Sequence, residues 1–62
     1  MKVGDVVSFK SDIEQCGTIV AIKFDIMGRK VLVLENEDGF EGDYLRYATR
    51  TEELASDCWV ED

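Results

Sequence analysis

Histidine and proline are both absent from this 62-residue chain. Without histidine the chain has no Ser-His or Cys-His nucleophile pair, no HExxH zinc motif and no histidine pH switch. A domain of this size buries only ~60% of the surface of its unfolded chain, which leaves no room for a second core or a deep substrate cavity. The sequence therefore favours surface recognition over catalysis, and we expect no enzymatic activity.

Cysteine is scarce, with Cys16 and Cys58 as its two occurrences. Two cysteines are too few for a disulfide scaffold and supply half of a tetrahedral zinc shell. A bond between them is geometrically conceivable, but in a reducing compartment we expect two free thiols. The acidic segment 35–39 lacks the spacing of an EF-hand loop. We therefore expect no metal ion and no other cofactor.

Long hydrophobic runs are also missing. The first residues lack the apolar stretch of a signal peptide, and no segment approaches the ~20 apolar residues that span a bilayer. We therefore expect a soluble, cytoplasmic protein.

Positive charge is the other scarce property, since seven Lys and Arg face fourteen Asp and Glu, for a net charge of -7. Phosphate binding relies on Lys and Arg, so direct nucleic-acid binding is disfavoured, and so is binding to an anionic membrane. A protein partner with a basic surface would be attracted instead.

The hydrophobic pattern predicts five strands, at residues 6–10, 18–24, 30–35, 40–45 and 58–61. Residues 18–24 are apolar at both parities, which indicates a bent strand or one covered on both faces. Asp25–Arg29 is expected to form a turn with Gly28 at positive φ. Asn36–Gly39 is expected to be a hairpin connection, because Asp-Gly between two strand-like runs favours a tight turn.

The segment after the fourth expected strand carries a helix signal. Thr49 and Glu52 have the spacing of a capping box, which predicts one or two helical turns over residues 50–55. The last strand is then expected to pair back near the N-terminus. Together these elements predict one all-β domain over residues 1–62, a small five-stranded antiparallel barrel with a short helical turn before its last strand. Its minimal core is expected to hold Phe9, Phe24, Phe40 and Trp59.

Two stretches resemble a known family. Gly4-Asp5-Val6-Val7, followed by Gly17-Thr18-Ile19-Val20-Ala21-Ile22, is similar to the opening of KOW-type and related SH3-like barrels. Residues 45–54 resemble the capped helical turn that closes many small SH3-like proteins, including bacteriophage ones. The resemblance implies an SH3-like barrel in a phage or bacterial accessory protein. RNA-binding KOW domains carry basic loops, whereas residues 11–16 here are acidic, so RNA binding does not follow.

A cluster of acids is the first candidate site: Glu35, Glu37, Asp38, Glu41 and Asp43. The expected hairpin gathers them, with Glu41 and Asp43 on one strand face. Such carboxylates could meet a basic partner, imitate a row of phosphates, or only keep a small protein soluble.

Aromatic residues form the second candidate, namely Tyr44, Tyr47 and Trp59. Trp59 alternates with Cys58 and Val60, so either Trp59 or that pair faces outward, and an exposed Trp59 would be the best interface anchor. The sequence thus predicts a non-enzymatic acidic interaction module that binds a protein partner, as a monomer or weak homodimer. The alternative is a nucleic-acid mimic that inhibits a basic DNA- or RNA-binding protein.

Overall fold

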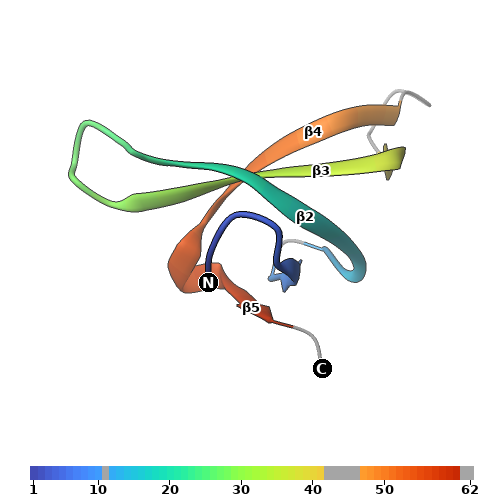
Figure 1. Ribbon diagram of the computed structural model, residues 1–62, viewed down its shortest axis with the longest axis horizontal. Coiled ribbons are helices and arrows are strands. Elements are labelled where there is room, and N and C mark those ends of the chain that lie inside the picture. The colour runs from blue at the N-terminus through green and yellow to red at the C-terminus, as the bar shows by residue number, and fades with distance from the viewer. Residues whose placement is uncertain (11, 42–46, 61–62) are drawn as a thin grey trace.

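One antiparallel sheet makes up almost the whole fold. The computed structural model describes residues 1–10, 12–41 and 47–60, with side chains placed for 1–10, 16–36 and 49–60. Its elements are β1 (Val6–Phe9), β2 (Asp12–Phe24), β3 (Lys30–Glu41), β4 (Tyr47–Leu54), the 3₁₀ helix η1 (Ala55–Asp57) and β5 (Cys58–Val60). Their order across the sheet is β4-β3-β2-β1-β5 (Figure 1). The predicted all-β class is confirmed, but the sheet is not closed into a barrel, because β4 and β5 lie at its two ends.

The two ends of the chain meet in this sheet. β5 pairs with β1 in the register Val7↔Val60, Ser8↔Trp59 and Phe9↔Cys58. The predicted return of the last strand to the N-terminal region is therefore confirmed. Ahead of β1, Gly4 adopts a positive φ of 99°, and its amide donates a hydrogen bond to the Ile19 carbonyl at 2.8 Å. This turn fixes the entry of β1 against β2.

The core lies on one face of the sheet. Its buried members are Val7, Phe9, Ile19, Leu32, Leu34 and Cys58. Side chains alternate between the faces of a strand, and the pairing of Ile19 with Leu34 places both on the inner face. The β2–β3 register shifts between Ile19 and Ala21, which bends β2 as its two-sided apolar pattern predicts. Ile22 and Ala55 pack against the margin of this core.

The hairpin connection predicted at Asn36–Gly39 is wrong. These residues lie within β3, which continues to Glu41 and so also takes in Phe40, the start of the separate strand expected at 40–45. Residues 42–45 of that expected strand are outside the described residues. The β3–β4 register shifts between Glu35 and Phe40. Asp38-Gly39 thus lies in an irregular part of a long strand and not in a tight turn.

The helical turns predicted over residues 50–55 are also wrong. Residues 47–54 form β4, and the 3₁₀ helix begins only at Ala55. Continuous pairing of Val31–Glu35 with Arg50–Leu54 gives this segment a ladder of backbone hydrogen bonds that a two-turn helix would forgo. The capping-box spacing is a local signal, and the sheet edge that β3 offers outweighs it.

The cysteines lie on opposite sides of β1. Cys16 on β2 faces Ser8, and Cys58 on β5 faces Phe9. Two strand spacings separate them by about 9.6 Å, beyond the ~7 Å between Cα atoms that a disulfide spans. Both thiols are free, Cys58 buried and Cys16 exposed, so the conceivable bond is not compatible with this sheet. No helix in the described part of the chain is long and apolar enough to cross a membrane.

Candidate interaction surface

The turn between β2 and β3 carries three highly exposed apolar side chains. Phe24 is 68% exposed, Ile26 102% and Met27 74%, the three highest values among the large apolar residues described. The hairpin that bears them projects from the rest of the sheet (Figure 1). Its last ladder pair, Phe24↔Lys30, lies beyond Val31↔Leu54, where β4 ends. The core position expected for Phe24 is therefore wrong, because the strand pairing that covers the hairpin stops short of it.

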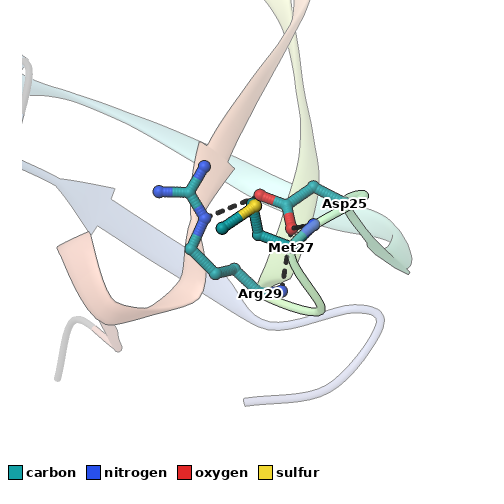
Figure 2. A network of polar contacts seen from close by, with 3 residues as sticks. All are labelled: Asp25, Met27 and Arg29. Atoms are coloured by element: carbon teal, nitrogen blue, oxygen red, sulfur yellow. Dashed lines mark hydrogen bonds and ion pairs between the residues drawn. The ribbon is translucent and has the colours of Figure 1, made fainter.

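Asp25 holds this turn in one conformation (Figure 2). Its Oδ1 accepts hydrogen bonds from the backbone amides of Met27 at 2.9 Å and Arg29 at 2.8 Å, while its Oδ2 accepts one from Arg29 Nε at 2.7 Å. Its main chain closes the loop as well, because its amide donates to the Arg29 carbonyl and its carbonyl accepts from the Gly28 amide, each at 3.0 Å. One carboxylate thus organises the backbone that presents Ile26 and Met27.

The chemistry of the turn matches this arrangement. The hydrogen bond from the Arg29 amide is the largest cause that lowers the pKa of Asp25 below its ordinary value, and the Arg29 side chain and the Met27 amide act in the same direction. Gly28 has a φ of 79°, which confirms the positive φ predicted for it. Because most side chains avoid this left-handed conformation, glycine lets the turn close without strain. The three apolar side chains are therefore presented by an ordered loop.

Basic residues surround the apolar turn. Residues 23–30 hold three of the seven bases and one of the fourteen acids, so this segment carries +2 and the remainder of the chain -9. Two of the bases are neutralised locally, because Lys23 Nζ lies 2.8 Å from Glu52 Oε1 and Arg29 pairs with Asp25. The apolar turn is consequently far less acidic than the surface behind it.

Only one of the five predicted acids has a placed side chain. The Glu35 carboxylate lies on β3 and accepts a hydrogen bond from Arg50 Nε at 2.9 Å. Glu37 and Asp38 lie in β3 by their backbone, so they do not occupy the hairpin tip expected at Asn36–Gly39, whereas Glu41 lies in a strand as expected. The side chains of these three residues are outside the described set, and Asp43 lies outside the described residues entirely.

The three predicted aromatics have different outcomes. Trp59 on β5 is 43% exposed and Cys58 beside it is buried, but Val60, which shares the parity of Cys58, is also 43% exposed, so the predicted division of β5 by parity does not hold. Trp59 therefore lies exposed at the edge of the sheet and not in the core position also considered for it. Tyr47 opens β4 opposite Glu41, but its side chain is outside the described set. Tyr44 lies outside the described residues.

The outer face of the sheet, opposite the core, has a shallow groove of about 530 Å³. Its lining residues are Val6, Cys16, Gly17, Thr18, Val20, Glu35 and Asn36. The Asn36 side-chain amide donates to the Cys16 carbonyl at 3.0 Å and joins β3 to β2 across its floor. The groove contains one carboxylate, already paired with Arg50, and one thiol. In the described residues no group of three or more Cys, Asp and Glu side chains is arranged to hold a metal ion.

Comparison of the chain with protein-family models, with curated proteins and with solved structures finds no match. The candidate surface therefore rests on the geometry of the turn. Sequence reasoning assigned Asp25–Arg29 to a turn but overlooked its apolar content. The signal was present in the sequence, because two consecutive large apolar residues, Ile26 and Met27, occupy a five-residue turn that offers them no interior to enter.

Proposed function

We propose that this protein is a non-enzymatic interaction module that binds a protein partner through the apolar turn between β2 and β3. The observation that carries the proposal is the group of three exposed apolar side chains, Phe24, Ile26 and Met27, on a turn held by Asp25. Exposure of such apolar surface to water is unfavourable in free energy, and its burial by a partner is favourable.

Energetics support the turn as the binding element. Burial of one such side chain contributes roughly 1.5–3 kcal/mol, so three of them supply most of the free energy that a modest interface needs. Binding usually costs additional free energy for ordering a loop, and the hydrogen bonds to Asp25 reduce that cost before the partner arrives. The partner is expected to offer an apolar pocket for the turn and a basic surface beyond that pocket, because the turn segment 23–30 carries +2 and the rest of the chain carries -9.

An SH3-like barrel belongs to the same proposal. Four strands in succession, a 3₁₀ turn and a fifth strand that returns to β1 are the order of elements that the resemblance implies. An accessory role in a phage or bacterium follows from the resemblance alone.

Nucleic-acid mimicry stays a prediction from the sequence. Of the acids that would form a phosphate-like row, Glu35 is the one with a placed carboxylate, and Arg50 neutralises it. We therefore do not propose mimicry in addition to partner binding.

The turn is tested by site-specific cross-linking. A photoreactive amino acid at position 26 is expected to capture one predominant protein in the native host, whereas the same group at the exposed Ser56 is not. The captured protein, once purified, should bind the variant Ile26→Ser/Met27→Ser at least tenfold more weakly than the unmodified chain.

Val3→Ser is the matched control, because Val3 is also apolar and 58% exposed but lies away from the turn. It should leave the affinity unchanged. Equal losses in both variants, or no loss in the double variant, would contradict binding through the turn.

A further inference from the structure

β4 is an edge strand whose charges complement a second copy of itself. Within the described residues 1–10, 12–41 and 47–60, it pairs with β3 on one side and ends the sheet on the other. We propose that two copies of this chain associate through antiparallel pairing of β4 with β4, about a two-fold axis that passes midway between the two Thr51 residues and stands perpendicular to the sheet. The proposal is independent of partner binding at the turn between β2 and β3.

The symmetry restricts the register. A perpendicular two-fold axis keeps equivalent faces of the two sheets on the same side, so it must pass midway between a residue and its own equivalent in the second copy. With the axis at Thr51, Arg50 stands opposite Glu52 of the second copy, and Thr49 stands opposite Glu53 of the second copy. Each contact occurs twice, so two opposite-charge pairs form and no like charges face each other.

Neighbouring registers are unfavourable. Moving the axis to position 50 places two Arg50 side chains against each other, and moving it to position 52 does the same with two Glu52 side chains. Directly opposed like charges destabilise an antiparallel pair, whereas opposite charges stabilise it. The sequence of β4 therefore disfavours both registers adjacent to the one at Thr51.

Ion pairs within the chain extend this complementarity. Lys23 Nζ contacts Glu52, and Arg50 Nε contacts Glu35 at 2.9 Å. By strand alternation Arg50 and Glu52 share the outer face, and their side chains are 65% and 54% exposed. In the dimer each row would run Lys23, Glu52, then Arg50 and Glu35 of the second copy, with alternating signs throughout.

A guanidinium supports such a bridging position. The contact with Glu35 uses Nε, and an arginine side chain carries four further N–H donors in a rigid planar fork. Arg50 can therefore contact a carboxylate of its own chain and one of the second copy at the same time. Added backbone hydrogen bonds along β4 would also remove an open sheet edge, which natural proteins tend to protect.

Charge reversal tests the register. Sedimentation equilibrium of the unmodified chain should show a concentration-dependent monomer–dimer equilibrium. Arg50→Glu and Glu52→Arg should each weaken self-association by about tenfold or more, because each places like charges in both symmetric contacts. Mixed one to one, the two variants should form a heterodimer, since every Glu at 50 and 52 of one chain then faces an Arg of the other.

The heterodimer distinguishes association from misfolding. Arg50→Glu lacks the in-chain pair with Glu35, and Glu52→Arg lacks the pair with Lys23, whether each variant is alone or in the mixture. Thr51→Cys in a Cys16→Ser background should oxidise to a covalent dimer, as directly opposed Cα atoms are about 4.5–5.5 Å apart. Thr49→Cys is the matched control, since its two copies would stand about 13 Å apart along the strands.

Several results would overturn the proposal. An unmodified chain that is monomeric at millimolar concentration, a mixture of variants that does not associate, or equal cross-linking at positions 49 and 51 would each do so. Dimers that persist in Arg50→Glu and vanish in Ile26→Ser/Met27→Ser would assign self-association to the turn between β2 and β3.

Discussion

The two ends of the β2–β3 hairpin treat apolar residues in opposite ways. At its base, Ile19 and Leu34 pair and are completely buried. At its tip, Phe24, Ile26 and Met27 are largely exposed. The same two strands thus bear a packed core at one end and an uncovered apolar turn at the other. The base is ordered by burial, whereas the tip is ordered by hydrogen bonds to one carboxylate, so apolar exposure there does not imply a loose loop.

The largest expected effect is on the free energy of unfolding, when apolar side chains at the base and at the tip of the hairpin are shortened. Ile19→Val should lower the free energy of unfolding by about 0.5–1.5 kcal/mol and Leu32→Ala by about 2–5 kcal/mol, because both side chains are fully buried. Ile26→Ala should stay within about 0.5 kcal/mol of the unmodified chain. Urea unfolding of the three variants measures this, and an Ile26→Ala loss as large as that of Leu32→Ala would abolish the comparison.

A smaller effect is expected from the backbone of the tip. Gly28→Ala should cost roughly 1–2 kcal/mol, because an L-residue is disfavoured at a φ of 79°. A Cβ placed there meets no atom within 4 Å, so the cost is conformational and not steric crowding. Gly28→Asn is the control and should cost less, since Asn tolerates the left-handed region. If both variants unfold at the same urea concentration as the unmodified chain, the turn is not held at this φ.

The smallest effect is confined to the tip and depends on pH. The pKa of Asp25 is lowered in the folded chain. The contribution of its ionised carboxylate to the stability of the turn is therefore present above the ordinary carboxyl pKa of about 3.9, and is lost as pH falls through the lower folded value. Amide chemical shifts of Met27 and Arg29 should therefore titrate together with a midpoint below about 3.9.

Asp25→Asn should remove that titration while leaving the amide shifts of core residues such as Leu32 in place. A midpoint above the ordinary carboxyl value would show that Asp25 does not hold the turn as an ionised group.

The sequence predicted those parts of the fold in which local pattern and long-range pairing agree. β1, the apolar part of β2, the turn at Gly28 and the return of the last strand follow from apolar alternation and turn residues. It failed where a strong local signal opposes pairing. Asp38-Gly39 favours a tight turn and Thr49 with Glu52 favours a helix start, yet both segments lie in strands, because the pairing of β3 with β4 continues on both sides of the register shift between Glu35 and Phe40. Sequence periodicity contains no information about which edge is available.

The candidate surface was less accessible to sequence reasoning. Parity alone did not choose between Trp59 and the pair Cys58 and Val60, and the structure exposes both Trp59 and Val60 at the end of β5. Phe24 was assigned to the core because aromatic residues in strands are usually covered. Phe24 lies one pair beyond the end of β4 at Leu54, and how far β4 extends is a property of the tertiary pairing. The acids were grouped around a hairpin expected at Asn36–Gly39, and β3 instead continues through these residues.

The contact between β1 and β5 also has a consequence for the order of folding. Val7 finds its partner Val60 only after 52 intervening residues have been synthesised. During translation β1 can pair with β2 early, but its other edge stays open, and Cys58 is missing from the core, until β5 emerges. Pairings between such distant residues are slow to form, so we expect completion of the sheet to be a late event that depends on β5.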